Sequence, residues 1–245
     1  MAVGYHVADE AGGLLWPPLT CGRLIKRYKR FLADVTLDSG ETVTAHCANS
    51  GAMRTCAEPG MRVWLSFHDN PKRKLRYTWE MIEMPGSLVG VNTQVPNLLV
   101  AEAIRHECVP LFSGYARVKP EATVSSGSRL DLMLTADARR TCYVEIKNCT
   151  LVEDRLARFP DAVTTRGQKH LAELMTLVKS GYRCAMFFLI QRMDAAGFRP
   201  ADDIDPAYGD ALRKAVAAGV EICVYDVFMD ETGIRLRQEI PLILR

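Results

Sequence analysis

Residues 184–190 (CAMFFLI) constrain the fold of this chain more than any other segment. They form a near-continuous apolar run of strand length, as expected of a central strand that is buried on both faces of a sheet. Helical patterns precede and follow this run, over residues 164–179 and 208–218, and each stops at a glycine, Gly181 or Gly219. A strand that is buried on both faces and bracketed by helices predicts a layered α/β domain.

The neighbouring segments extend this domain in both directions along the chain. Pro96 opens a helical pattern over residues 97–107, and strand-like segments follow at 117–124, 130–135 and 141–147. Two more strands are expected at 220–227 and 234–243, after the helix at 208–218. The resulting order, α-β-β-β-α-β-α-β-β, predicts one α/β domain with a central mixed sheet over residues 91–245.

The first third of the chain has a different pattern of short strands separated by turns. Strand-like segments are expected at residues 23–37, 42–47, 61–67, 75–83 and 88–91. About five short strands with frequent turns are typical of a small barrel or sandwich. The size and the basic residues favour an OB-like β-barrel over residues 1–90.

The charge of the chain is nearly balanced overall but concentrated locally. With 31 Lys and Arg against 29 Asp and Glu, the net charge of +2 excludes a strongly basic nucleic-acid binder. Residues 23–76 carry 11 basic and 5 acidic residues, a local excess of 6. Two runs supply most of it, and we expect their basic residues to contact nucleic-acid phosphates: Lys26, Arg27, Lys29, Arg30, Lys72, Arg73, Lys74 and Arg76.

Aromatic residues interleave with these basic runs. Tyr28, Phe31, Tyr77 and Trp79 could stack on bases while the neighbouring cations neutralise phosphates, which is how barrel folds bind single strands. In the alternative interpretation, the aromatic rings belong to the core and the charges only face solvent. The sequence leaves both interpretations open.

The expected location is the cytoplasm, with no membrane partner. No apolar run reaches the 18 or so residues that a membrane-spanning helix needs. The N-terminal residues also lack the basic and apolar regions of a signal peptide.

Three charged residues on two adjacent predicted strands form the strongest chemical signal. Glu145 and Lys147 are two residues apart on one strand, so they project from the same face. Asp131 lies on the preceding strand, with 13 residues in between, which is enough for two strand halves and a hairpin turn. We therefore expect Asp131, Glu145 and Lys147 to converge at one place on the sheet.

This Asp-x(n)-Glu-x-Lys pattern is that of the PD-(D/E)XK nuclease superfamily. Two carboxylates suit Mg²⁺ or Mn²⁺, and a bound metal polarises a phosphodiester and activates water. The lysine would position that water or offset phosphate charge. In the alternative interpretation without catalytic function, Glu145 and Lys147 form an ordinary solvated ion pair on the surface. Glu102, on the helix before the strands, is expected as a further metal ligand, or else as an exposed helix glutamate.

Polar residues crowd the expected N-terminus of the helix at 164–179, where Thr164 or Thr165 can act as the cap. Basic and amide groups at a helix N-terminus indicate a nearby anion such as a phosphate. We assign Gln168 to the catalytic group, and Arg166 and Lys169 to nucleic-acid contact. Surface solubility is the alternative for these two cations.

The segment Asn49-Ser50-Gly51-Ala52-Met53-Arg54 is typical of a tight polar turn. Gly51 is available there for a positive φ, which glycine adopts without steric cost. By itself this turn indicates no function.

Taken together, these motifs resemble the sugar fermentation stimulation protein A family. The segments that carry the resemblance are 24–35 (LIKRYKRFLADV), 49–53 (NSGAM), 77–80 (YTWE), 91–93 (VNT), 129–131 (RLD), 143–147 (YVEIK), and 159–162 (FPDA) through to His170-Leu171. They cover about residues 20–240, whereas the first 15 or so residues lie outside the pattern. The resemblance implies an N-terminal OB-like barrel, a PD-(D/E)XK nuclease-like α/β domain, DNA binding of low sequence specificity and a role in sugar (maltose) metabolism.

Three functions remain open from the sequence alone. The chain could bind DNA with a nuclease-like domain that serves as a binding module. It could be a nuclease that uses Mg²⁺ or Mn²⁺ to cleave DNA, RNA or single strands. It could also bind an oligosaccharide or another small anion in its barrel. DNA binding is common to the first two, and we expect it as the main function.

Overall fold

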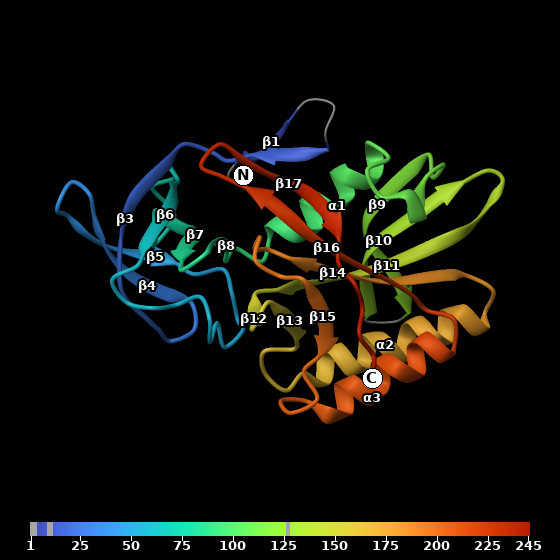
Figure 1. Cartoon of the computed structure of the whole chain (residues 1–245). Coiled ribbons are helices and arrows are strands. Elements are labelled where there is room, and N and C mark those ends of the chain that lie inside the picture. Colours follow the sequence, from blue (N-terminus) through green and yellow to red (C-terminus); the bar gives the residue numbers. More distant parts are fainter. Residues whose placement is uncertain (1–3, 9–11, 126–127) are drawn as a thin grey trace.

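The computed structural model describes residues 4–8, 12–125 and 128–245 of the chain. A β-barrel occupies one side, and a larger mixed α/β domain occupies the other (Figure 1). None of the helices in this described part is long and apolar enough to cross a membrane.

The barrel confirms the predicted OB-like architecture. Its strands are β3 (Leu19–Tyr28), β4 (Leu32–Leu37), β5 (Thr42–His46), β6 (Arg62–Phe67), β7 (Tyr77–Met84) and β8 (Ser87–Gly90). They lie in the order β5-β4-β3-β6-β7-β8, and a parallel pairing between β5 and β7 closes the barrel. The single strand predicted at 23–37 is a hairpin instead, because Lys29 and Arg30 adopt φ values of 48° and 62° and turn the chain.

Trp79 belongs to the barrel core, so the stacking role considered for it is wrong. Its ring is 0% exposed and packs with Leu24, Val35 and Leu65. The indole Nε1 donates to the Met81 carbonyl at 2.9 Å, which satisfies the only polar group of the ring. Phe31, by contrast, is 47% exposed in the β3–β4 turn.

The larger domain is built on an eight-stranded mixed sheet, as predicted. Its strands run in the order β1-β2-β17-β16-β14-β11-β10-β9. The central strands β11 (Arg139–Cys149), β14 (Arg183–Ile190) and β16 (Glu221–Met229) are parallel. The antiparallel flanks are β9 (Arg117–Ser125), β10 (Ser128–Ala136), β17 (Gly233–Glu239), β2 (Gly13–Leu15) and β1 (His6–Ala8).

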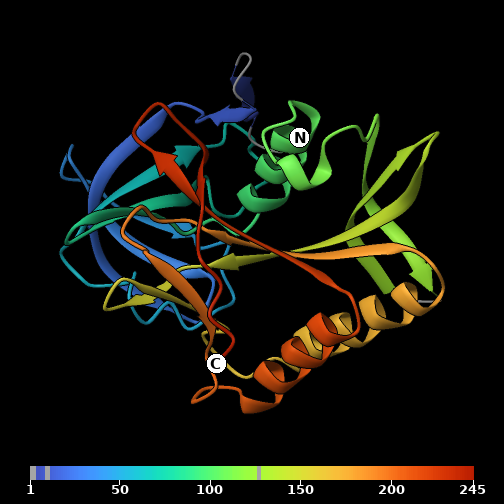
Figure 2. The ribbon, with the colours of Figure 1, turned by 45° about the vertical axis from the view of Figure 1, so that its right-hand side comes forward.

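Helices cover both faces of this sheet (Figure 2). Helix α1 (Val95–Arg105) packs on one face, and α2 (Thr165–Lys179) and α3 (Pro206–Ala217) pack together on the other. A short helix, η1 (Pro110–Phe112), follows α1. Consistent with burial on both faces, Phe187 of β14 contributes to the core beneath α1, and Phe188 to the core beneath α2 and α3.

Side-chain caps define where α2 and α3 begin. The Thr164 hydroxyl accepts a hydrogen bond from the Gly167 N–H at 3.0 Å, and Asp205 accepts one from the Tyr208 N–H at 3.0 Å. Each cap satisfies a backbone donor that has no partner within its helix. Asp205 also accepts the Thr164 N–H at 2.8 Å, so it links the starts of both helices.

Five short strands were absent from the sequence-based prediction. β12 (Leu151–Glu153), β13 (Leu156–Phe159) and β15 (Gly197–Pro200) form a small separate sheet. β1 and β2 lie within the region predicted as barrel, residues 1–90, but join the large sheet through the pairs Gly233↔Leu15 and Ile234↔Leu14. That part of the domain division is wrong, because these N-terminal residues cover the edge of β17.

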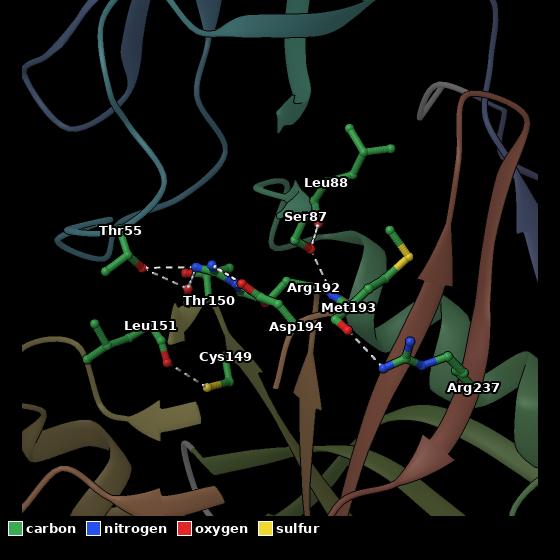
Figure 3. A network of polar contacts seen from close by, with 10 residues as sticks. All are labelled: Thr55, Ser87, Leu88, Cys149, Thr150, Leu151, Arg192, Met193, Asp194 and Arg237. Atoms are coloured by element: carbon green, nitrogen blue, oxygen red, sulfur yellow. Dashed lines mark hydrogen bonds and ion pairs between the residues drawn. The ribbon is translucent and has the colours of Figure 1, made fainter. Parts of the chain in front are cut away.

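A buried polar network fixes the barrel against the larger domain (Figure 3). The guanidinium of Arg192 donates to the Thr55 hydroxyl at 3.1 Å and to the Thr150 carbonyl at 3.0 Å, and it forms an ion pair with Asp194. The Met193 N–H donates to the Ser87 hydroxyl at 2.9 Å. Thr55 and Ser87 belong to the barrel part of the chain, so these bonds set the orientation of the two domains.

A second buried cluster surrounds Glu80 on β7. This carboxylate is 0% exposed and accepts hydrogen bonds from the Ser66 hydroxyl (2.6 Å), the Tyr5 hydroxyl (2.7 Å) and the Asn92 amide (2.8 Å). Burial raises the pKa of Glu80 more than these hydrogen bonds lower it.

This raised pKa predicts a loss of stability as the pH increases. The folded protein holds the Glu80 proton more tightly than the unfolded chain, so the free energy of unfolding falls as pH rises from the ordinary glutamate pKa, about 4.3, to the raised value. Glu80→Gln should remove this contribution, about 1.4 kcal/mol per unit of pKa difference. Urea unfolding at a series of pH values above 4 would measure it, and an unchanged pH dependence in the variant would contradict the assignment.

Candidate functional site

Asp131 occupies a gap that opens between two neighbouring strands. The pairing of β10 with β11 ends at Leu132↔Val144, whereas β11 continues to pair with β14 as far as Cys149. The Asp131 carboxylate fills the gap, where it accepts the Ile146 N–H at 2.7 Å and the Asn97 amide of α1 at 2.8 Å. The side chain thus replaces the backbone bond that the diverging strand no longer provides.

Glu145 and Lys147 project from β11 toward α2, as their spacing predicts. One carboxylate oxygen of Glu145, Oε1, contacts both Lys147 Nζ and His170 Nδ1. Lys147 Nζ also lies 3.2 Å from His170 Nδ1. Val144 and Ile146 point to the opposite face and pack beneath α1.

The pKa values of the two carboxyl groups, Asp131 and Glu145, are shifted in opposite directions. Burial raises the pKa of Asp131, and the charge of Glu145 raises it further, which shows that the two acids sense one another. Burial would also raise the pKa of Glu145, but the hydrogen bond from His170 and the charge of Lys147 outweigh it and hold that pKa below its ordinary value. Opposite shifts in one site are typical of functional groups.

One carboxylate oxygen of this site has no partner among the described residues. Glu145 Oε2 is buried and receives no hydrogen bond from any residue that the structure describes. A buried carboxylate oxygen without a donor is costly. A hard divalent cation that bound this oxygen and Asp131 would satisfy it and would relieve the repulsion between the two acids, so the donor set fits Mg²⁺ or Mn²⁺.

The protein offers two carboxylates rather than a complete metal cage. Over residues 4–8, 12–125 and 128–245, no group of three or more His, Cys, Asp or Glu side chains has the arrangement of a metal site. Mg²⁺ commonly keeps several waters and binds through one or two carboxylates plus substrate phosphates. Asp131 and Glu145 would therefore hold the cation together with water and substrate.

Two other residues assigned to the site point elsewhere. Glu102 forms an ion pair with Arg105, one turn further along α1. Gln168 donates its amide to both oxygens of Asp205, at 3.1 and 3.3 Å, and so supports the start of α3. Their roles as metal ligand and catalytic residue stay predictions, and each would require the side chain to leave its present partner.

The two basic runs gather at one end of the barrel. The register Leu32↔His46 and His46↔Thr78 places the β3–β4 turn beside the start of β7, which the second run precedes. Lys29, Arg30, Lys72 and Lys74 are exposed there. Arg166 and Lys169 are located near the start of α2 in the other domain.

Four residues of these runs already have partners, among them Arg73, which donates to the Thr78 hydroxyl at 3.3 Å. Arg27 donates to the carbonyls of Asn49 and Gly51, both at 2.9 Å, and thereby holds the turn that follows β5. Arg76 pairs with Asp69 at 2.7 Å, and Lys26 lies 3.8 Å from Asp34. Arg27 therefore has a structural role that its position in a basic run did not predict.

The turn at residues 49–54 packs against the larger domain, where Asp161 accepts the Met53 N–H at 3.1 Å. The positive φ of this turn lies at Met53, 53°, and not at Gly51. A Cβ at position 51 would lie 2.5 Å from Asp161 Oδ2, so a larger residue there would require that carboxylate to move. The contact between the domains, rather than the φ of Gly51, favours the small residue.

Sequence reasoning missed Asn97 as a partner of Asp131. Asn97 is a polar residue on an amphipathic helix and carries no local signal of a site. His170 likewise has no role assigned from the sequence, in which it stands only at the end of a segment that carries the family resemblance. His170 follows Gly167 and Gln168 on the first turns of α2, the helix that faces Glu145. Its apolar neighbour Leu171 gives no indication of this position.

Comparison with known proteins agrees with this architecture. Residues 25–91 match the family model described as the SfsA N-terminal OB domain, and residues 94–233 match that of the sugar fermentation stimulation protein RE domain. A sugar fermentation stimulation protein homolog of Geobacter sulfurreducens is 52% identical over 226 residues, which are 92% of this chain and 97% of the relative. A homolog of Pelobacter propionicus is 52% identical over 228 residues, 93% and 99% of the two chains.

A solved structure is also similar over almost the whole chain. The structure of Pyrococcus furiosus SfsA in complex with Ca²⁺ superposes with a TM-score of 0.86 and 26% identity, covering 94% of this chain and 97% of that one.

Proposed function

The chain belongs to the sugar fermentation stimulation protein family, and we propose that it binds nucleic acid and hydrolyses phosphodiester bonds with Lys147 and a divalent cation held by Asp131 and Glu145. The observation that carries this proposal is the buried Glu145 carboxylate, whose Oε2 has no hydrogen-bond donor within the described residues, while Lys147 contacts its other oxygen and its charge acts on Asp131. The Pyrococcus furiosus relative was solved in complex with Ca²⁺, which supports a hard cation for this chain as well.

Each residue of the site would have a distinct role in such a reaction. Asp131 and Glu145 would hold the cation, which when bound would polarise the phosphodiester and lower the pKa of a coordinated water. Asn97 and the Ile146 N–H fix the orientation of Asp131. His170 fixes Glu145 and leaves Lys147 Nζ at the site, where its charge can orient water and stabilise the negative charge of the transition state.

Binding without turnover is the second candidate function. The exposed cations at the barrel end favour it, because they suit a polyanion whether or not cleavage follows. DNA is the expected partner, and RNA or single strands would suit the same charges. The family name suggests sugar metabolism as the physiological setting of either function, and we propose a regulatory role there, in maltose metabolism.

The deciding experiment incubates the purified protein with end-labelled single- and double-stranded DNA and RNA, in Mg²⁺, Mn²⁺ or EDTA. Cleavage that needs the cation and is lost in Glu145→Gln would support the hydrolase. Binding without cleavage in either cation would favour the second candidate function, a module that only binds nucleic acid. If neither binding nor cleavage were observed, the proposal would be refuted.

Binding is expected to weaken steeply with salt. Each phosphate contact contributes roughly 0.7–0.9 to the slope of log K against log salt concentration. The double variant Lys72→Ala/Lys74→Ala should therefore reduce the magnitude of the slope by about 1.4–1.8 and weaken binding to all nucleic-acid sequences alike. Fluorescence anisotropy with labelled oligonucleotides would measure the slope.

The matched control for this measurement is Lys179→Ala/Lys214→Ala, which removes two lysines from the last turns of α2 and α3. It should leave the slope unchanged. Equal slopes in the wild type and in the Lys72/Lys74 variant would refute the assignment of this basic run to phosphate contact.

A further inference from the structure

A cavity of about 250 Å³ lies between the barrel and the larger domain. Its walls are the turn at residues 49–51, Thr93, residues 148–151 and residues 158–164. Three of these wall segments run directly into the candidate site: Thr93 precedes Asn97, Asn148 follows Lys147, and Thr164 caps the helix that carries His170. The walls of the cavity are therefore continuous along the chain with the elements of the candidate site, although Asp131, Glu145 and Lys147 do not line the cavity themselves.

The charges of the cavity do not suit a phosphate group. Its only ionisable wall residues among those described, apart from the buried thiol of Cys149, are Asp161 and Arg158. The guanidinium of Arg158 already forms ion pairs with Glu153, at 2.5 Å, and with Asp203. No uncompensated cation remains on the described walls, and the carboxylate of Asp161 would repel an anion.

The cavity does offer hydrogen-bonding groups of both kinds. Asp161 uses Oδ2 to accept the Met53 N–H, and Oδ1 receives no hydrogen bond from the described residues. Asn148 uses Oδ1 to accept the Gln191 amide at 2.8 Å, and its Nδ2 group likewise donates to none of them. One acceptor and one donor are thus available for a polar, uncharged ligand.

Apolar surface completes the walls. Leu151, Phe159 and Pro160 line the cavity, and Val163 lies on its wall with 70% of the residue exposed. Flat apolar surface with a few oriented polar groups is what a nucleobase requires, since bases are read by stacking and by hydrogen bonds to their edges.

We propose that this cavity receives one unpaired nucleobase of the nucleic acid bound at the carboxylate site, so that the preferred substrate is a single strand or a duplex with an unpaired end. The inference rests on the proposed function, because a base can reach the cavity only if its strand extends there from the carboxylate site. A base within an intact duplex is stacked and paired, and extracting it has an energetic cost that a single strand avoids.

The test measures binding rather than cleavage. Single-stranded oligonucleotides with one abasic position, moved stepwise along the strand, are titrated against the Lys147→Ala protein in EDTA, so that cation-dependent cleavage does not consume the strand. Removal of the base at one position should weaken binding by roughly 10-fold, the typical contribution of one stacked base. The same protein should bind a blunt duplex more weakly than a single strand.

The matched variants localise the effect. Ala162→Phe, made in the Lys147→Ala background, places a bulky ring on the cavity wall, where it competes with a base for the space. This variant protein should therefore bind intact and abasic strands with equal affinity. Ala172→Phe makes the same substitution on the exposed face of α2, away from the cavity, and should preserve the discrimination. Asp161→Asn can retain the bond from the Met53 N–H while it turns the available acceptor into a donor, so the base preferred at the sensitive position should change.

The outcomes separate this inference from the proposed function. Absence of binding to any nucleic acid would refute the proposed function itself. Binding that is equally strong for every abasic position, or discrimination that survives in Ala162→Phe, would overturn the cavity assignment and leave the proposed function intact.

Discussion

Lys147→Ala is expected to lower the turnover number of phosphodiester cleavage by about 10²–10³, the usual effect of removing one group that stabilises transition-state charge. The affinity for nucleic acid should change by no more than the loss of one phosphate contact. The reason is position: Lys147 Nζ lies against Glu145 and His170 at the carboxylate site, and its side chain is only 15% exposed. Single-turnover cleavage and equilibrium binding, measured on the same labelled strand, would separate the two effects.

Lys214→Ala is the control, since Lys214 is a lysine in the last turn of α3, outside the candidate site. Thermal unfolding of both variants would show that the fold is retained. Cation-dependent cleavage that persists at the wild-type rate in Lys147→Ala protein would mean that the activity resides elsewhere.

Asp131→Asn is expected to abolish most of the stabilisation that a divalent cation gives the protein. A ligand that binds only the folded state at 100 times its dissociation constant adds about 2.7 kcal/mol. For a chain of this length that corresponds to a rise in melting temperature of about 5–10 °C. The wild type should show such a shift in Mn²⁺, and the variant should not, because a neutral amide is a poor ligand for a hard cation.

In EDTA the variant should be at least as stable as the wild type. Burial and Glu145 both disfavour the charge on Asp131, and the asparagine oxygen can still accept the Ile146 N–H. Asp137→Asn, on the β10–β11 hairpin turn, serves as the matched control and should keep the full Mn²⁺ shift. Identical shifts in the wild type and in Asp131→Asn would contradict the assignment of Asp131 as a metal ligand.

The sequence predicted the parts of the structure that depend on local periodicity. The apolar run of β14 indicated a strand buried on both faces, and the structure confirms it. The spacing of Glu145 and Lys147 predicted a common face because side chains alternate along a strand. Asp131 was expected near them because the hairpin between β10 and β11 is short, and the structure places its carboxylate on the Ile146 N–H of β11.

Features that depend on distant contacts were not predictable in this way. β12, β13 and β15 have only three or four residues each, too few for a periodic pattern. An aromatic residue in a short strand can face the core or a ligand, and only the closed barrel decides that Trp79 is buried. The preference for a small residue at position 51 arises from Asp161, 110 positions further along the chain.

The pairing of β2 with β17 has a consequence for the order in which the chain can complete its fold. Leu15 is made early in synthesis, but its partner Gly233 follows 218 positions later, so the N-terminal strand stays without its partner until nearly all of the chain has been made. A loop of this length closes late, because the chain must lose conformational entropy before the contact can stabilise the closed form. Tyr5, which bonds Glu80, is brought into place by the same segment. The strand pairs of the barrel lie within residues 19–90, whereas the outer edge of the large sheet and the Tyr5 contact of the Glu80 cluster wait for β17, so a chain released before β17 would lack both at once.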